Sequence, residues 1–458
     1  MIRGNDWSAL STEPLPPELL RPVSVIIPAK TTQRDLDLCL SALARQTYPL
    51  ELLDVVVVDH RSDTPLKANL PDDAPLRVNV HRLESGDGPG AARAHGAELA
   101  VAEVLLFLDA DIVAGADLVY NYARWVLQDR AVLALGHREF LLDSTPVEKL
   151  SDAVTSGDFT KLLQNWAAPE GQEWIGRFLD RAEGGLATRD DYWAIVVGAG
   201  ICVHRDLYQQ CGGFRDYPIH GVEDIEFGYR AVNSGAVVIS DPQAVGYHLG
   251  MRRISQERAA TDRARMPMLW NLIAHRAYRD LHLGRRWTVP YLHIEVTASA
   301  QDSMETIAKT CNSLLANTLT DLHITLRLGD DHPDQALLER LYAAETCITL
   351  DTAADSARTV PVSSPLALFT RAGVVFGADA LGQITQSFND LDLGRLRLVA
   401  GNETEAAEVL RTATFGRASL YVKDEVGLDF TDIFHHLGGD SVLGASQFGI
   451  TSGQEAAK

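Results

Sequence analysis

The sequence predicts an α/β protein with two units, the first of which has a mostly parallel sheet. Short apolar runs alternate with stretches of helical periodicity through the first 250 residues. A similar order of strand, helix and strand starts again near Thr288. A chain of 458 residues is also too long for one ordinary core. Together these observations predict two sheets, the first with helices on both faces.

The expected elements of the first unit follow one another at short intervals. Strands are expected at 23–27, 54–58, near 77–81 and at 105–111, and helices at about 33–46 and from the glycine-rich turn 86–90 to about 100. Residues 198–249 predict a strand, a helix, a Gly-Gly turn, a loop, a helix and a strand. Residues 144–195 are less regular, and their tryptophans 166, 174 and 193 suit either a cleft or packing.

These elements divide the chain into five predicted parts. They are a proline-rich arm at 1–21, a first α/β domain at 22–250, a basic helical connector at 251–287, a second α/β domain at 288–450 and a tail at 451–458. The stretch 291–328 resembles 23–59 in order and spacing, which indicates a weak internal repeat. The second unit lacks an Asp-x-Asp after an apolar strand. It is therefore expected to be structural or to bind an acceptor.

Composition excludes several classes of protein. A net charge of −21 argues against broad nucleic-acid binding. The five cysteines are scattered and form no Cys-x-x-Cys, so neither zinc nor a disulfide framework is implied. No apolar run approaches the roughly 20 residues needed to span a bilayer, and the N-terminus does not have the pattern of a signal peptide. The sequence therefore predicts a cytoplasmic protein.

The connector is the one strongly basic region. Residues 252–286 contain nine arginines and three acids, with apolar residues interleaved at near-helical spacing. Two interpretations stay open. The segment is either an amphipathic helix that contacts a membrane surface or an anionic ligand, or a helix packed on the domain with a solvated basic face.

Two carboxylates end the most apolar strand. Residues 104–111 read Val-Leu-Leu-Phe-Leu-Asp-Ala-Asp, so Asp109 and Asp111 lie at the carboxyl edge of the predicted sheet. Open α/β sheets bind their ligands at this edge. Carboxylate oxygens suit a divalent cation such as Mn²⁺ or Mg²⁺, which in turn suits a diphosphate. Alone, the pattern also fits a strand followed by an Asp-rich turn.

The first 250 residues resemble the family 2 glycosyltransferases, inverting enzymes of the GT-A fold, through five pieces in order. These are Val23-Ser-Val-Ile-Ile-Pro28, Val55-Val-Val-Val-Asp59-His-Arg-Ser62, Gly88-Pro-Gly-Ala-Ala-Arg93-Ala-His-Gly96, Phe107-Leu-Asp-Ala-Asp111, and Gly212-Gly-Phe214 with Gly221-Val-Glu-Asp224. The sequence departs from the family at His60, Arg61 and Ala94, where the family has Asp, Gly and Asn. These departures bear on base and sugar specificity.

The resemblance implies roles for the acidic residues and one histidine. Asp111 would be the main metal ligand, with Asp109 facing the ribose or a metal-bound water. His248, after the last predicted strand, would be a further ligand. Asp224 would be the general base, and Glu223 would contact the acceptor or the sugar. A base opposite the leaving group would invert the anomeric configuration.

The resemblance also implies a nucleotide site along the strand ends. Pro28 and Ala29 would line the base, and Asp59 would accept a hydrogen bond from it. Arg93 would reach the base or the phosphates, and Arg252 would fold over the diphosphate. Each of these also fits an ordinary structural role: a strand-end turn for Asp59, a surface ion pair for Arg93 and a solvated basic loop for Arg252.

The expected activity is metal-dependent transfer of a hexosyl group from a nucleoside diphosphate donor. Uridine diphosphate is the donor nucleotide that the resemblance favours. The acceptor would be a hydroxyl of a small molecule, a peptide or a glycan. A non-catalytic subunit that binds a nucleotide sugar is the alternative. A dinucleotide-binding oxidoreductase is disfavoured because Pro28-Ala-Lys30, rather than a glycine turn, follows the first strand.

Overall fold

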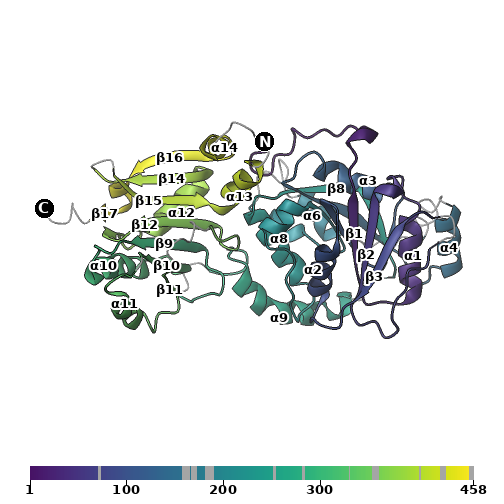
Figure 1. The fold of residues 1–458 in the computed structure, drawn as a ribbon, viewed down its shortest axis with the longest axis horizontal. Helices are drawn as coiled ribbons and strands as arrows, with labels where there is room; N and C mark the ends of the chain where they lie inside the picture. Colours follow the sequence, from purple (N-terminus) through teal and green to yellow (C-terminus); the bar gives the residue numbers. More distant parts are fainter. Residues whose placement is uncertain are drawn as a thin grey trace.

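The computed structural model describes most of the chain. The described residues are 1–70, 74–156, 166, 173–180, 190–250, 254–280, 284–329, 331–352, 360–401, 404–422 and 430–452. They form two α/β units side by side (Figure 1), as the sequence predicts. Within these ranges no helix is long and apolar enough to cross a membrane.

The first unit is built on an eight-stranded sheet in the order β3-β2-β1-β4-β7-β6-β8-β5. Its strands are β1 (Val23–Ala29), β2 (Leu53–Asp59), β3 (Arg77–Arg82), β4 (Val104–Leu108), β5 (Ile112–Ala114), β6 (Val132–Phe140), β7 (Gly200–His204) and β8 (Val237–His248). Strands β1 to β4 are parallel, whereas β7 runs antiparallel to its neighbours β4 and β6. The predicted strands are all present, with small shifts of their ends.

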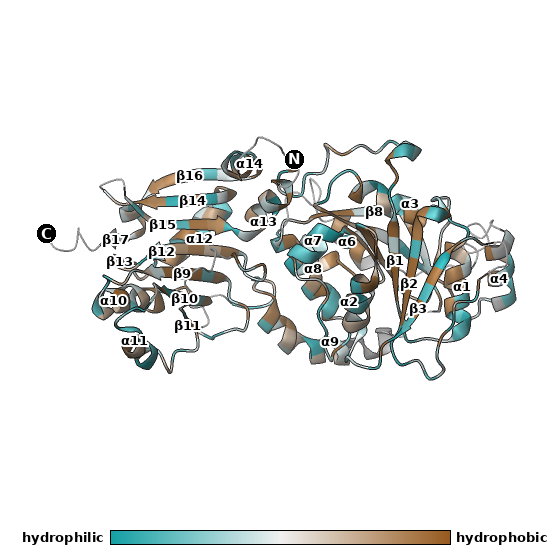
Figure 2. Ribbon diagram, in the orientation of Figure 1, coloured by the Kyte–Doolittle hydropathy of each residue, from teal (hydrophilic) through white to brown (hydrophobic). Residues whose placement is uncertain are grey.

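Helices cover both faces of this sheet, so its central strands are apolar on both sides (Figure 2). Helix α2 packs on β1 and β2, and α3 packs on β4, β6, β7 and β8. The helices are α1 (Gln33–Leu43), α2 (Pro89–Leu99), α3 (Leu118–Val126), α4 (Val147–Ser156), α6 (Glu173–Asp180), α7 (Arg205–Gln210), α8 (Glu223–Asn233) and α9 (Ile254–Leu272). Single 3-10 turns lie at η1 (Pro17–Leu19), η2 (Leu50–Leu52) and η4 (Tyr192–Ile195).

The second unit is built on a seven-stranded sheet in the order β11-β10-β9-β12-β15-β14-β16. Its strands are β9 (Leu292–Ala298), β10 (Leu322–Leu328), β11 (Ile348–Asp351), β12 (Leu366–Arg371), β14 (Leu393–Val399), β15 (Glu405–Arg411) and β16 (Gly439–Gly444), and β13 (Val374–Val375) pairs separately with β17 (Thr451–Ser452). The helices are α10 (Met304–Leu315), α11 (Gln335–Leu341), α12 (Ala380–Asp390), α13 (Thr412–Tyr421) and α14 (Phe430–Leu437), with a 3-10 turn η5 (Ala445–Phe448). Because Thr451 and Ser452 form a strand, the expected tail does not begin at 451; residues 453–458 lie outside the described part.

The two sheets share one topology. Taken in order from β3 and from β11, their first seven strands match in position and in parallel or antiparallel sense. The turn after the first helix is also built in the same way. The Gln46 amide donates to Gly115 O and accepts from Val119 N, while the Asn317 amide donates to Gly377 O and accepts from Leu381 N. The similarity seen in the sequence thus reflects a repeated architecture.

Strand registers identify matching positions in the two units. Val104 of β4 lies opposite Val23, and Leu366 of β12 lies opposite Leu292. Counting along each strand, Asp109 corresponds to Arg371 and Asp111 to Gly373. His248 lies opposite Ile112, and Ser452 lies opposite Val374, so these two residues also correspond. The second unit therefore has no acidic pair and no histidine at these positions.

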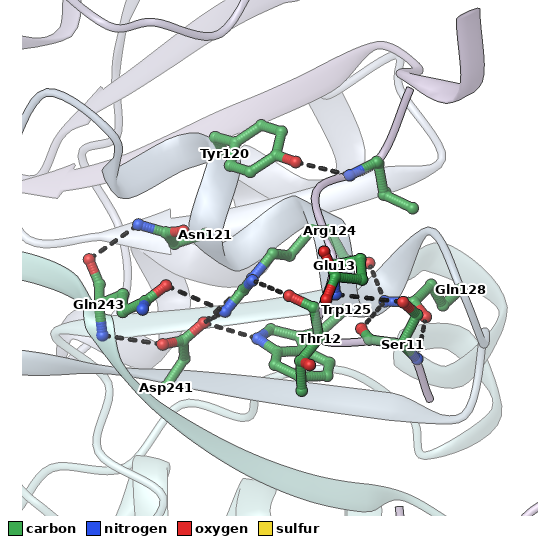
Figure 3. A network of polar contacts seen from close by, with 11 residues as sticks. Ser11, Thr12, Glu13, Tyr120, Asn121, Arg124, Trp125, Gln128, Asp241 and Gln243 are labelled. Carbon is green, nitrogen blue, oxygen red and sulfur yellow. Dashed lines mark hydrogen bonds and ion pairs between the residues drawn. The ribbon is translucent and has the colours of Figure 1, made fainter. Parts of the chain in front are cut away.

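The N-terminal arm is held against the first unit by polar contacts. Figure 3 shows Arg124 of α3 donating to Asp241 (2.7 Å) and to Thr12 O (3.2 Å), with Gln128 bonded to Ser11. Nearer the N-terminus, the Asn5 side chain exchanges two hydrogen bonds with the backbone of Val238. The arm expected on the surface therefore has its first residues packed into the structure.

The connector packs on the first unit and is tied to the second. Leu269 and Ile273 are buried in the core of the first unit, which favours the interpretation of a packed helix. Arg279 then pairs with Asp321, which precedes β10, at 2.8 Å, and both side chains are almost fully buried.

Burial raises the pKa of Asp321 to about 6, although Arg279 opposes the shift. A carboxyl whose pKa is raised by folding stabilises the folded state below its unfolded pKa and loses this contribution as pH rises through about 6. We expect the urea concentration at the unfolding midpoint to decrease when the pH is raised from about 4.5 to about 7. This decrease should be larger in the wild type than in Asp321→Asn. Equal pH dependence of the two proteins would contradict this expectation.

Candidate active site

The acidic pair lies just beyond β4. Antiparallel pairing of Ile112 with His248 brings the end of β8 beside this segment. His248 Nε2 is 3.3 Å from Asp111 Oδ2, whereas Asp111 Oδ1 is buried and has no hydrogen-bond partner. Burial and the neighbouring Asp109 raise the pKa of Asp111, and His248 opposes this shift. The structure thus brings two of the three expected metal ligands together.

Asp109 faces a different partner. Its Oδ1 accepts a hydrogen bond from Arg93 at 2.8 Å. Within the described ranges, no three His, Cys, Asp or Glu side chains converge as a complete metal site. The residues nevertheless fit a divalent cation, because Asp111 offers a buried oxygen without a partner beside an imidazole nitrogen.

Arg93 is a buried link between the two acidic motifs. Besides Asp109, it donates to Glu223 Oε1 at 3.3 Å, and its side chain is 3% exposed. Burial alone would lower the pKa of Arg93, but Asp109 and Glu223 outweigh it. A Cβ on Gly198 would lie 2.6 Å from the guanidinium, so glycine leaves the room that Arg93 occupies. In this arrangement Arg93 contacts carboxylates rather than pointing freely toward a base or phosphate.

Glu223 and Asp224 are the first two residues of helix α8 but have different structural roles. Glu223 is 2% exposed and accepts from Gly221 N at 2.8 Å, so it holds the loop rather than facing solvent. Burial and the neighbouring Asp224 raise the pKa of Glu223. Asp224 accepts from the backbone N–H groups of Gly198 and Ile225, at 3.3 and 2.9 Å, and is only partly buried. Of the two, Asp224 is the carboxylate that an acceptor could reach.

Arg138 is a site residue that the sequence analysis did not identify. It lies on β6, is partly buried, and experiences the charges of Asp109, Asp111 and Asp224. Burial lowers the pKa of its guanidinium, and these carboxylates oppose the shift. The available signal was the polar stretch His137-Arg138-Glu139 near the end of an apolar run.

The expected nucleotide residues lie together at the ends of β1 and β2. Pro28 pairs with Val58, and Ala29 pairs with Asp59 across these parallel strands. The carboxylate of Asp59 accepts from Ser62 N, Leu66 N and Arg82. Burial would raise the pKa of Asp59, but these hydrogen bonds outweigh it and lower the pKa. Asp59 therefore shapes the loop after β2, as the strand-end interpretation predicts.

His60 and Arg61, the two residues after β2 that differ from the family pattern, have a structural role. His60 and Arg61 both contact the carbonyl oxygen of Gly86 in the glycine-rich turn. Arg61 has a φ of 58°, a conformation that favours glycine. The same turn is held from the other side by Asp216, which accepts from Asp87 N and Gly88 N.

Two further residues of interest in the sequence are Trp193 of the irregular segment and Arg252 of the basic connector. Trp193 is buried and packs against Tyr229, His275 and Tyr278, which agrees with a packing role. Arg252 lies outside the described residues.

Comparisons with known proteins agree on one family. Residues 24–178 match the family model described as glycosyl transferase family 2. The hyaluronan synthase of Pasteurella multocida is 23% identical over 354 residues, which cover 70% of this chain and 34% of that protein. The validoxylamine A glucosyltransferase of Streptomyces hygroscopicus subsp. jinggangensis is 39% identical over 224 residues, covering 45% of this chain and 50% of that protein. The chain thus spans half or less of the length of these relatives.

Solved structures include similar proteins. The mannosyltransferase PcManGT of Pyrobaculum calidifontis, in complex with GDP-Man and Mn²⁺, has a TM-score of 0.34 and 18% identity, covering 58% of this chain and 66% of that one. The family match over residues 24–178 and the named relatives thus confirm that the first unit resembles the family 2 glycosyltransferases.

Proposed function

We propose that the protein is a metal-dependent, inverting glycosyltransferase that uses a UDP-sugar donor. The observation that carries the proposal is the pair of Asp111 and His248 at the carboxyl edge of the sheet, with Asp111 Oδ1 buried and free of hydrogen bonds. Such an oxygen is costly to bury unless it gains a partner. A divalent cation held by Asp111 and His248 would provide one.

The charges around this edge suit a diphosphate leaving group. A bound Mn²⁺ or Mg²⁺ would clamp the diphosphate and stabilise the negative charge that develops on it. Arg138 adds a partly buried positive charge that interacts with those of Asp109 and Asp111. Arg93 holds Asp109 in place, and Pro28, Ala29 and the loop shaped by Asp59 would form the wall for the base.

Asp224 is proposed to be the general base. Two backbone N–H groups fix its carboxylate, which leaves lone pairs free to accept the proton of an acceptor hydroxyl. Glu223 is proposed to position this loop through Gly221 and Arg93 rather than to contact the acceptor. Attack by a hydroxyl deprotonated at Asp224, from the face opposite the diphosphate, would invert the anomeric carbon.

The acceptor proposed is a hydroxyl of a small molecule or a glycan. The name of the 39% identical relative, a glucosyltransferase of validoxylamine A, favours a small molecule and a hexosyl group. The names hyaluronan synthase and poly(ribitol-phosphate) β-glucosyltransferase favour a polymeric acceptor. A non-catalytic subunit that binds a nucleotide sugar is the alternative, and it would show donor binding without turnover.

Calorimetric binding of UDP, GDP and dTDP, with and without Mn²⁺, tests the donor site. We expect UDP to bind only with metal, and Asp111→Ala to weaken this binding at least about 100-fold through loss of a metal ligand. Asp206→Asn is the matched control, because Asp206 lies in the same unit and pairs with Arg130 away from this edge. Binding of UDP that is equally tight without metal, or in Asp111→Ala, would contradict the proposed metal site.

A further inference from the structure

A cavity of about 410 Å³ lies between the two units, away from the proposed donor site. This volume lies in the range of small-molecule sites. Its wall is formed in part by the N-terminal arm, the C-terminal half of α8, the stretch after α9 and the start of α13. In Figure 1, α13 lies where the second unit meets the first.

Two arginines give this wall a positive charge that carboxylates do not balance. Arg411 donates to Leu393 O and Phe388 O, and Arg417 donates to carbonyl oxygens of Ile2, Gly4, Gly235 and Ala236. In the described part of the chain neither guanidinium has a carboxylate partner. The exposed acids that line the cavity are already paired, Asp190 with Arg276 at 3.3 Å and Asp392 with Arg3 at 3.7 Å.

The N-terminus of α13 adds to this charge. Arg411 is the N-cap, no side chain caps the helix, and its first turn contains no acidic residue. Ala413 and Thr414 line the cavity, and helix geometry leaves their N–H groups without an intrahelical acceptor. The dipole of a helix favours negative charge at this end.

The corresponding helix of the first unit, α7, shows how side chains can satisfy the N–H groups at such a helix end. Register places Arg411 at the position of His204, because Leu366 lies opposite Arg411 as Val104 lies opposite His204. His204 caps α7 by accepting from Asp206 N, and Asp206 supplies an acid in the first turn. Two residues after Arg411, the second unit has Ala413 instead. The acid of the first unit is thus replaced by a small residue beside a cavity.

The rest of the wall suits a hydroxyl-bearing molecule. It is lined by aromatic rings and by amide side chains, namely Tyr192, Trp193, Tyr229, Tyr291, Asn233 and Asn389. Flat aromatic faces and amide groups can contact the apolar and hydroxyl parts of a sugar, while guanidinium and N–H groups bind an anion.

We propose that this cavity binds an anionic sugar or polyol, with its phosphate or carboxylate held by Arg411 and the first turn of α13. Arg411 is the principal ligand, since in the described part of the chain backbone carbonyls engage only its Nε–H and one Nη–H. Arg417 contributes charge and holds the arm in place.

Calorimetry on the full chain, without metal, tests the proposal with glucose 6-phosphate, glucuronate, inorganic phosphate and glucose as probes. We expect a charged sugar to bind more tightly than glucose or inorganic phosphate, and the two charged sugars to separate a phosphate from a carboxylate site. Ala413→Asp, which restores the acid of the first unit, should weaken this binding at least about tenfold through like-charge repulsion. Ala413→Asn is the uncharged control and should bind as the wild type does.

Arg411→Gln should also weaken binding, and its melting temperature shows whether the fold is kept. UDP binding with Mn²⁺ should be unchanged in Ala413→Asp, which separates this site from the proposed donor site. The proposal is overturned if neither charged sugar binds, or if Ala413→Asp and Ala413→Asn bind them equally. Equal affinity for glucose 6-phosphate and inorganic phosphate would overturn the sugar-binding role of the wall.

Discussion

Asp224→Asn is expected to lower kcat roughly 10²- to 10⁴-fold, the range that general base catalysis contributes. Asparagine keeps the size of the side chain, and its single oxygen can still accept from one of the two N–H groups, Gly198 N or Ile225 N. It cannot take the proton of the acceptor. Metal-dependent UDP binding should therefore remain within about threefold of the wild type, and steady-state transfer to the acceptor should report the loss.

A matched control separates this effect from a change at the helix end. Asp206→Asn removes an acid from the first turn of α7, as Asp224→Asn removes one from α8. The control should keep the wild-type kcat. A kcat in Asp224→Asn within a factor of a few of the wild type would reject Asp224 as the base.

Glu226→Gln is expected to lower the free energy of unfolding by about 3–5 kcal/mol, the cost of leaving a buried charge unpaired. Arg230 is completely buried and pairs with Glu226 at 2.7 Å, while donating to Gly213 O at 2.7 Å. Glutamine would keep the shape of the side chain but remove the counter-charge. Urea denaturation should show a lower midpoint in the variant.

The exposed Glu98 provides the control, since Glu98→Gln should leave the midpoint nearly unchanged. The double variant Arg230→Met, Glu226→Leu removes both charges and should be less destabilised than Glu226→Gln. A midpoint for Glu226→Gln equal to that of the wild type would show that the pair contributes little.

The fold could be predicted from the sequence because its signals are local. The apolar strand before Asp109 and the glycine turn that opens α2 depend on residue order and backbone preference, and both are present. The positions of Asp111 and Asp224 follow from the ends of such elements. The observed strand ends differ from the predicted ones by a few residues, because tertiary packing rather than propensity sets them.

Contacts between distant side chains could not be predicted in the same way. Arg93 lies on a helix that suggests a surface residue, yet it is buried between Asp109 and Glu223, 16 and 130 residues away. Arg138 joins the site only because β6 is placed within the sheet beside β7 and β8. Pairings of this kind depend on the complete fold, which no short stretch of sequence encodes.

The repeated sheet offers a practical advantage for protein engineering. The second unit keeps the strand order of the first and a turn in which Asn317 takes the place of Gln46, yet carries Arg371, Gly373 and Ser452 at the positions of Asp109, Asp111 and His248. It therefore offers the same backbone arrangement without the acidic pair and the histidine. Residues transplanted from the first edge to the second can therefore be assessed beside their original setting, in one polypeptide and under one set of conditions.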